Sequence, residues 1–347
     1  MKPGAKSWYH EQVVRIRESH TIFVILHWLS RIAAIPSFWP YILWMQSDMC
    51  HDCPRRCGVD RAHGIEGWCR LPGYEPWIAS ICRHTGEEPA LGGTGGVANV
   101  FYTHCNLACV YCQNADISQR SLPLPDPVPV SEAVRRIEDL LARGARAVGF
   151  VSPSHQPRAT AAIIDALRAR GVRAPMIWNS SAYDEPSVLR AMEERIDIWL
   201  PDFKYADPAL AACLSQAADY PETALRALRE MYRQKGSFLD TDDDGLAISG
   251  LIVRHLVLPG QVANSLACLD LLAQDLSPRV TVSLMAQYHP LPGMPAPLDR
   301  TLTLAEYHEV IECMHARGFV NGWLQELDSH VEHLPDFANP ADPFGVE

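Results

Sequence analysis

From about residue 86 onward, the sequence alternates between two patterns of hydrophobic and polar residues. The first is a short apolar run typical of a buried β-strand, and it occurs at residues 96–103, 147–152, 174–179, 196–203, 251–258 and 280–288. The second has apolar residues every three or four positions, as on one helix face, and it covers residues 131–144, 158–171, 184–195, 221–236, 263–276 and 304–318. Strands that alternate with helices predict an α/β fold with a parallel sheet buried on both faces. A last apolar run at 318–327 predicts one more strand.

The N-terminal part has a different pattern. Residues 21–46 are unusually apolar and rich in tryptophan, but His27 and Arg31, then Pro36 and Pro40, interrupt the run. A membrane-spanning helix needs about 20 apolar residues in succession. The run follows charges of both signs and shows no small-residue cleavage site, which argues against a secretory signal. We interpret this segment as a helix packed on the protein and not as a membrane span.

The length of 347 residues is enough for one large domain with additions. The patterns divide it into an apolar helical extension (1–48), a cysteine-rich segment (49–85), a β/α region (86–330) and a C-terminal tail (331–347). A β/α barrel takes about 250 residues, which fits the third part.

Charge and cysteine content narrow the class of protein. The formal net charge is -11 and the chain has no long basic run, so the electrostatic footprint of a nucleic-acid-binding protein is absent. Eight of the 11 cysteines lie between Cys50 and Cys112. Such clusters in a long, otherwise ordinary chain indicate metal or iron–sulfur ligation and not a disulfide framework. This usage predicts a reducing compartment, the cytosol.

Three of these cysteines follow the first predicted strand of the β/α region directly. They are Cys105, Cys109 and Cys112, in the stretch HCNLACVYCQN. In parallel β/α proteins, the loops at the carboxyl ends of the strands build the active site. Thiolates are the usual ligands of iron–sulfur clusters, and three of them on a four-iron cluster leave one iron open to a small ligand. The alternatives are a fragment of a zinc ribbon or three cysteines in a core.

The spacing Cys105-x3-Cys109-x2-Cys112, with Tyr111 before the third cysteine, resembles the signature of the radical S-adenosylmethionine (radical SAM) superfamily. The resemblance implies a partial (β/α)6 barrel similar to a TIM barrel, in line with the alternation of strands and helices. It also implies a [4Fe-4S] cluster whose open iron chelates S-adenosylmethionine. One electron then cleaves the cofactor, and a 5′-deoxyadenosyl radical takes a hydrogen atom from a substrate.

Later segments resemble one branch of that superfamily. LPDFKY (200–205), RHLVLPG (254–260) and QYHP (287–290) each end a predicted strand and are similar to strand ends of pyruvate formate-lyase activating enzymes. The preceding segment CHDCPRRCGVDR…GWC, together with NSSAYD and IVRHLVLPG, resembles the PflX-type homologues of those enzymes. The resemblance covers about residues 49–330.

This resemblance implies cofactor contacts at four positions on two strand ends. Asp202 and Lys204 are expected near the cofactor, with Lys204 as the partner of the methionyl carboxylate. The alternative for Lys204 is an ordinary exposed lysine at a strand end. Asn179 and Ser181 are expected near the methionyl or ribose portion.

Two further positions are implied on the later strands. Arg254 and His255 are adjacent on one strand and point to opposite faces, and we assign Arg254 to the barrel interior. His289 is expected beside the adenine, with a capped surface histidine as the alternative.

One stretch departs from the activating enzymes. They carry a Gly-Gly-Glu type motif after the second strand, which holds the amine of the cofactor, whereas residues 151–157 here read VSPSHQP. Ser152, Ser154 and His155 can offer polar contacts, but none of them is a carboxylate. The departure weakens a direct assignment as an activator of a glycyl radical enzyme.

A second cysteine set precedes the first, with the spacing Cys50-x2-Cys53-x3-Cys57-x11-Cys69. Four thiolates fit a closed structural zinc site or an auxiliary iron–sulfur cluster. Spacing does not decide between them, and we favour zinc because arginines 55, 56 and 61 suggest a binding surface. The remaining cysteines, at positions 82, 213, 268 and 313, are expected to pack in the core.

The sequence thus predicts a radical SAM enzyme that generates a deoxyadenosyl radical. Its electrons are expected from a reductant such as flavodoxin or ferredoxin, and its substrate is a partner protein or a small molecule that the sequence does not name. The alternatives are an iron–sulfur protein that transfers electrons or senses redox state, and a binding module in which both cysteine sets hold zinc.

Overall fold

A computed structural model describes residues 49–327 and 335–345. The extension predicted for residues 1–48 lies outside the described residues. Residues 47–347 form one compact unit, so the cysteine-rich segment and the β/α region fold together. In the part of the chain that the structure describes, no helix combines the length and apolar character that crossing a membrane requires.

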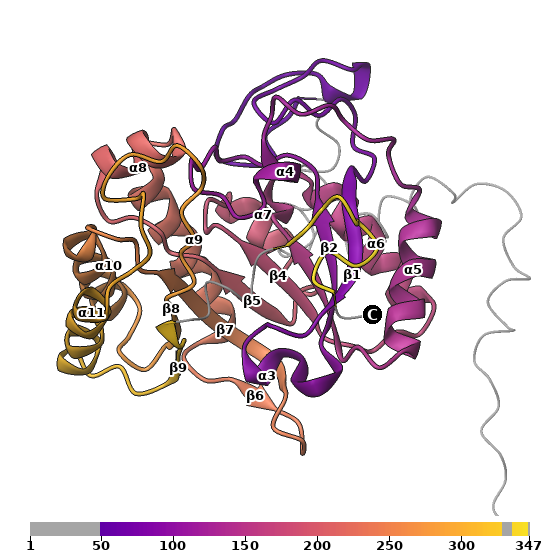
Figure 1. The fold of residues 1–347 in the computed structure, drawn as a ribbon. Coiled ribbons are helices and arrows are strands. Elements are labelled where there is room, and N and C mark those ends of the chain that lie inside the picture. The colour runs from indigo at the N-terminus through magenta and orange to yellow at the C-terminus, as the bar shows by residue number, and fades with distance from the viewer. Residues whose placement is uncertain (1–48, 328–334, 346–347) are drawn as a thin grey trace, which may run out of the picture. The chain divides into compact units, whose positions relative to one another are not determined.

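An open, nearly all-parallel sheet forms the centre of this unit (Figure 1). The strands are β1 (Ile78–His84), β2 (Val97–Tyr102), β3 (Ala147–Val151), β4 (Met176–Ser180), β5 (Ile198–Pro201), β7 (Ala247–Leu256), β8 (Thr281–Met285) and β9 (Gly322–Leu324), hydrogen-bonded in that order. All neighbours from β2 to β9 are parallel, and β1 is antiparallel to β2. The short β6 (Asp240–Thr241) pairs antiparallel with β7. The path does not close, which confirms the predicted α/β fold with a partial, TIM-like barrel.

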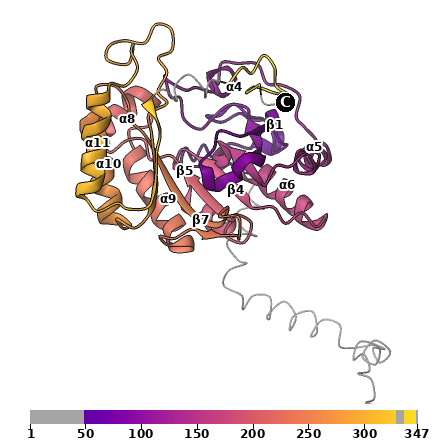
Figure 2. The same cartoon turned by 60° about the horizontal axis from the view of Figure 1, so that its bottom comes forward.

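The helices lie along the outer side of the curved sheet (Figure 2). They are α5 (Val130–Ala142), α6 (Pro157–Ala169), α7 (Pro186–Ala191), α8 (Pro208–Ser215), α9 (Tyr220–Lys235), α10 (Val262–Asp275) and α11 (Leu304–Ala316). Helices α6, α7, α8 and α9 have proline in the first turn. Proline costs no hydrogen bond there, because the N–H groups of the first turn have no acceptor within the helix. Helix α11 begins at a capping box of Thr303 and Glu306. The six helical patterns in the sequence are all helices here, whereas α8 and strand β1 were not anticipated.

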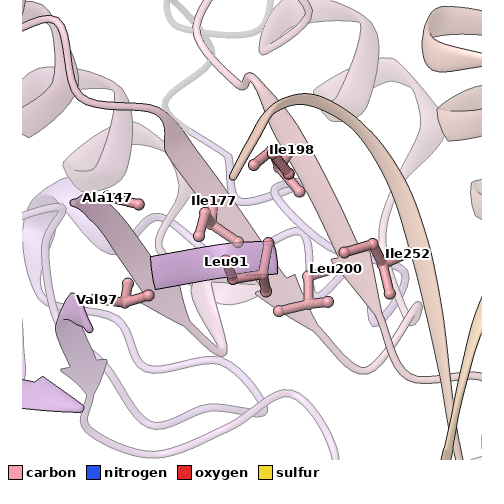
Figure 3. Close-up of a cluster of buried hydrophobic side chains, with 8 residues drawn as sticks. Leu91, Val97, Ala147, Ile177, Ile198, Leu200 and Ile252 are labelled. Carbon is pink, nitrogen blue, oxygen red and sulfur yellow. The ribbon is translucent and has the colours of Figure 1, made fainter. Parts of the chain in front are cut away.

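A cluster of aliphatic side chains fills one end of the barrel interior (Figure 3). Leu91 of helix α3 (Pro89–Gly92) belongs to this cluster. Its other members come from strands β2, β3, β4, β5 and β7 and include Val97, Ile177 and Leu200. Burying a leucine or isoleucine side chain contributes about 1.5–3 kcal/mol each. In Figure 1, α3 lies at the bottom, beside β6 and the amino ends of the parallel strands. The opposite end, at the carboxyl ends of the strands, carries the loops that hold the cysteines and the short helix α4 (Ala115–Ser118).

Two segments complete this end of the barrel. The cysteine-rich loops of residues 49–77, with one turn of 3-10 helix (Arg61–His63), lie at the top of Figure 1. Residues 335–345 pack against β1 and β2. Phe337 meets Phe101 of β2 edge to face at 5.4 Å. The hydroxyl of Ser80, on β1, donates to the Pro340 carbonyl at 2.6 Å.

Candidate cofactor and substrate site

The three-cysteine loop begins where β2 ends. His104 has a φ of 61°, which turns the chain sharply out of the strand. The loop then rests on the end of α8, because the Ala108 and Val110 amides donate to the carbonyls of Ser215 and Leu214. Cys105, Cys109 and Cys112 line one cavity of about 180 Å³ at the carboxyl ends of the strands, which we call the cofactor cavity.

Each sulfur of this first cysteine set accepts a hydrogen bond. The Leu107 amide donates to Cys105 at 3.4 Å, the Ser215 hydroxyl to Cys109 at 3.0 Å and the Ser118 hydroxyl to Cys112 at 3.3 Å. Donors of this kind stabilise thiolates and tune the centre that the thiolates bind. The three sulfurs are therefore prepared for ligation.

An aromatic chain supports the loop from behind. The Tyr111 hydroxyl lies 2.6 Å from that of Tyr205, which lies 2.7 Å from the Ser215 hydroxyl. Tyr111 thus reaches Cys109 through two intermediate hydroxyls. It lines the cofactor cavity, but its hydroxyl is engaged inside the protein.

Lys204 is the positive charge beside the first cysteine set. Its Nζ lies 2.7 Å from an Asp202 oxygen, and both residues line the cofactor cavity. Burial opposes the lysine charge, but the Asp202 carboxylate and the Cys109 thiol outweigh it and raise the pKa of Lys204. Burial raises the pKa of Cys105 to about 12, and Lys204 acts in the opposite direction. Asn179 and Ser181 line the same cavity.

A second cavity of about 390 Å³ adjoins the cofactor cavity, and we call it the adjoining cavity. Both are lined by Phe101, Gln113, Asn114, Val151, Asn179, Arg254, Met285 and Gln287. Trp323, Gln325 and Phe344 line the adjoining cavity but not the cofactor cavity. The two spaces thus provide room for a cofactor and, next to it, a second molecule.

Residues 99–240 match the model of the radical SAM superfamily. This stretch is a radical SAM domain. An uncharacterized protein of Methanocaldococcus jannaschii is 28% identical over 278 residues, which is 76% of this chain and 73% of that protein.

Solved structures similar to this chain have low sequence identity. SuiB of Streptococcus suis, bound to its precursor peptide SuiA, has a TM-score of 0.46 and 12% identity over 67% of this chain, and this chain spans 49% of SuiB. Methylornithine synthase (PylB) has a TM-score of 0.45 and 14% identity over 76% of this chain and 66% of that one. A domain of a pyruvate-formate lyase-activating enzyme from Bacteroides vulgatus has a TM-score of 0.38 and 13% identity, over 52% of this chain and 99% of that domain.

The ligand set fits the cluster that the superfamily implies. Each cysteine of a four-iron cluster binds a different iron, so three cysteines leave one iron without a protein ligand. Three sulfurs that line one cavity, each with a donor, suit three irons of a four-iron cluster. Asn179, Ser181, Asp202 and Lys204 line the same cavity as these sulfurs.

Arg254 lines both cavities, but it has carboxylate partners that the sequence reasoning missed. Its Nε donates to Glu88 at 2.7 Å, and its Nη2 contacts Glu88 at 2.6 Å and Glu87. Burial opposes the Arg254 charge, but Glu88 and Glu87 overcome it and hold its pKa well above the usual value. Both glutamates precede α3 and line the adjoining cavity. The only sign of this pairing in the sequence was that two adjacent acidic residues, Glu87 and Glu88, precede a predicted strand.

His255 points away from both cavities. Its Nδ1 lies 2.6 Å from the Phe203 carbonyl and its Nε2 2.9 Å from the Ser265 hydroxyl on α10. Burial lowers the pKa of His255 to about 4, against the hydrogen bond to Phe203, which raises it.

This shift predicts a pH dependence of stability. In the unfolded chain a histidine has a pKa of about 6.5, so the unfolded state takes up a proton first as the pH falls. Above a pH of about 6.5, the neutral form of His255 contributes fully to the stability of the fold. This contribution, about 3 kcal/mol of unfolding free energy, is lost as the pH falls towards 4. We expect His255→Gln to flatten the fall in unfolding free energy, measured with urea between about pH 7 and about pH 5.

The control for this measurement is His315→Gln, on the exposed face of α11. It should retain the wild-type slope. An unchanged slope in His255→Gln would remove His255 as the source of the pH dependence.

The stretch 151–157 contributes less to the cofactor cavity than its polar residues suggested. Ser152 lines the cavity, whereas Ser154 and His155 are not among its lining residues. His155 is buried, with its Nε2 3.0 Å from the Thr103 carbonyl, and burial lowers its pKa to about 3. His289 also lies outside the lining of both cavities, whereas Gln287, two residues earlier, lines both.

The second cysteine set lies next to this site. Cys50, Cys53 and Cys69 are buried and Cys57 is half-buried. Arg61, which the sequence suggested as part of a binding surface, is 1% exposed. That expectation was wrong because the guanidinium is enclosed by Cys50, Asp52 and the His155 carbonyl.

Proposed function

We propose that this protein is a radical SAM enzyme that cleaves S-adenosylmethionine reductively, with a [4Fe-4S] cluster on Cys105, Cys109 and Cys112. The observation that carries the proposal is the shared cavity, in which three hydrogen-bonded sulfurs face the Asp202–Lys204 pair at the carboxyl ends of the strands. When bound, the cluster and S-adenosylmethionine supply a 5′-deoxyadenosyl radical that takes a hydrogen atom from a substrate.

The residues of the chain have separate tasks in this proposal. Lys204 is placed to bind a carboxylate, and Asp202 sets its orientation through their ion pair. Asn179, Ser181 and Ser152 offer amide and hydroxyl groups to the remaining polar atoms of the cofactor. Arg254 is neutralised by its two glutamates, so it is placed to position them and is less suited to bind an anion.

The adjoining cavity is our candidate for the substrate site, because it shares a wall with the cofactor cavity. Its polar lining includes Glu87, Glu88, Gln287 and Gln325. The similarity of the strand-end segments to pyruvate formate-lyase activating enzymes supports hydrogen abstraction from a protein backbone, and the volume of about 390 Å³ supports a small molecule. A flavodoxin or ferredoxin is the expected electron donor in either case.

The test is an anaerobic turnover assay. Purified, reconstituted protein is reduced with dithionite and incubated with S-adenosylmethionine, and 5′-deoxyadenosine is quantified by chromatography. Product at a rate above the protein-free control supports the proposal. An intact cluster that gives neither product nor a spectral change on addition of the cofactor contradicts it and favours an electron-transfer protein. A spectral change without product shows cofactor binding that awaits the substrate.

A further inference from the structure

Arginine side chains gather around Trp68 of the cysteine-rich segment. The guanidinium carbons of Arg55 and Arg120 each lie 3.8 Å from the centre of the Trp68 ring. Arg70 follows two residues after Trp68 and is exposed. Guanidinium groups are attracted to the face of an indole ring, so two of these cations are held in place. We call Arg55, Arg70, Arg120 and Trp68 the arginine patch.

The positive charge of the patch is not balanced within the described part of the chain. There, Arg55, Arg70 and Arg120 form no ion pair with a carboxylate, whereas the neighbouring Arg56 pairs with Glu185 at 2.9 Å. Burial lowers the pKa of Arg120, and the nearby charges of Arg55 and Arg70 lower it further. Like charges held together in this way repel one another, and an anionic partner would relieve the repulsion.

The patch contrasts with the charge of the whole chain. The formal net charge is -11, so the average field of the molecule repels other acidic proteins. That field is screened beyond about 8 Å at physiological ionic strength, which leaves local charges to decide where a partner binds. A patch of unpaired arginines is therefore a place where an acidic protein can approach this acidic chain.

The patch is attached to the loop of the first cysteine set. The Arg55 Nε donates to the carbonyl of Asn106, the residue after Cys105, at 2.9 Å. On the other side of Cys105, the His104 Nδ1 lies 2.8 Å from the carbonyl of Cys69, which is the residue after Trp68. The patch thus contacts the residues on both sides of a sulfur ligand.

A second attachment runs through the end of α8. The Arg55 Nη1 donates to the Gln216 carbonyl at 2.8 Å, and the Arg120 Nη2 donates to the Gln216 side-chain oxygen at 3.2 Å, both at the surface. Gln216 follows Ser215, whose hydroxyl donates to the sulfur of Cys109 at 3.0 Å. A protein seated on the patch would be close to the centre that these sulfurs hold.

An exposed apolar side chain lies on the same loop. Val110, between Cys109 and Cys112, is exposed, and its amide donates to the carbonyl of Leu214, two residues before Gln216. Protein interfaces combine apolar contacts with surrounding polar and charged groups. Val110 and the patch together provide both kinds of contact beside the first cysteine set.

The position of the patch selects the class of partner. Arg55, Arg70 and Arg120 line neither the cofactor cavity nor the adjoining cavity, so they do not contact a molecule bound there. A nucleic acid is disfavoured by the net charge and by the absence of a long basic run. The centre on the first cysteine set needs an electron from outside, and electron transfer slows steeply with distance. An acidic protein that brings an electron fits both the charge and the place.

We propose that the arginine patch is the docking surface for a small acidic electron-transfer protein, a flavodoxin or ferredoxin. One electron leaves the flavin or iron–sulfur centre of the donor and enters the centre on Cys105, Cys109 and Cys112, and no bond forms or breaks. The docking depends on the charge of the patch alone, whereas the use of the electron rests on the proposed function.

The experiment measures reduction of the full, reconstituted chain by fully reduced flavodoxin, and separately by reduced ferredoxin, in an anaerobic stopped-flow instrument. Arg70→Glu and Arg120→Glu are compared with the wild type. Arg70 suits this test because, in the described part of the chain, its side chain makes no hydrogen bond. We expect each variant to lower the second-order rate constant at least tenfold at low ionic strength, and salt should narrow the difference.

Binding gives a readout that needs no turnover. Titration calorimetry with oxidised flavodoxin should show a weaker dissociation constant in both patch variants than in the wild type. Neither donor reducing or binding the wild-type protein would overturn the inference. So would patch variants that match the wild type in both measurements.

The matched control is Arg173→Glu. Arg173 is an exposed arginine in the loop between α6 and β4, at the amino ends of the strands, and in the described residues it forms no ion pair. The control makes the same change in net charge far from the patch in the fold, and it should keep the wild-type rate. Equal slowing in Arg173→Glu would show that net charge alone acts, which also overturns the inference.

A small reductant separates this inference from the proposed function. With dithionite in place of a protein donor, both patch variants should form 5′-deoxyadenosine at the wild-type rate. Loss of that turnover would place the arginines in the cofactor site and contradict the docking role. Patch-dependent reduction by flavodoxin, without any 5′-deoxyadenosine or spectral response to S-adenosylmethionine, would contradict the proposed function and leave the docking surface standing.

Discussion

Cys109→Ala is expected to reduce 5′-deoxyadenosine formation to the level of the protein-free control. Cys109 is one of three sulfurs in the cofactor cavity, and Ser215, 3.0 Å away, is oriented towards it. Two remaining thiolates leave a second iron without a protein ligand, so the cluster is lost or bound too weakly to survive purification. Iron content, the visible absorbance of the cluster and product formation should fall together.

The matched control is Cys213→Ala, which removes an exposed thiol on α8 that belongs to neither set. It should retain cluster and turnover. Circular dichroism separates loss of the cluster from loss of the fold, since the sheet and its helices do not depend on the Cys109 side chain. Turnover in Cys109→Ala at a rate near that of the wild type would contradict the ligand assignment.

Lys204→Met is expected to weaken the binding of S-adenosylmethionine by at least tenfold. The substitution removes the cation that faces Cys109 and leaves the Asp202 carboxylate, 2.7 Å from the lost amine, without its partner. A tenfold loss corresponds to about 1.4 kcal/mol, which is within the range of one charge-assisted hydrogen bond. The dissociation constant is measured by following the absorbance of the oxidised cluster during cofactor titration.

A double variant distinguishes binding from stability. Lys204→Met alone should also lower the unfolding free energy by about 1–3 kcal/mol, because a partly buried charge is left unpaired. Asp202→Asn/Lys204→Met removes both charges, so it should recover most of the stability without recovering cofactor affinity. Arg146→Met, which breaks an exposed pair with Asp244, should change stability by at most about 1 kcal/mol and leave affinity unchanged. Recovered affinity in the double variant would mean that Lys204 acts only through Asp202.

The sequence predicted the order of strands and helices because each element carries its own local signal. The apolar run 147–152 became β3 and the helical pattern 221–236 became α9, each within a few residues. Strand β1 was missed because its residues IASICRH contain polar positions and lie in a segment read for its cysteines. Helix α8 is too short and too uniformly apolar to show a helical period.

The candidate site also has features that the sequence predicted and features that only the structure shows. The spacing of Cys105, Cys109 and Cys112 after a strand was sufficient to place three sulfurs in one loop, because all three ligands are close in sequence. The pairing of Arg254 with Glu87 and Glu88 joins residues more than 160 positions apart. It depends on which strand neighbours which and on where α3 enters the barrel.

By itself, then, the sequence determined the alternation of elements, the three-cysteine loop and the position of that loop at a strand end. All of these follow from contacts among residues near one another in the chain, whose periodicity and spacing are visible in one dimension. The tertiary structure decided that Arg61 is buried, that His255 faces α10 and that His104, next to the first cysteine set, is hydrogen-bonded to the Cys69 carbonyl of the second. These depend on packing between distant segments, where burial and register choose the partner of each polar group.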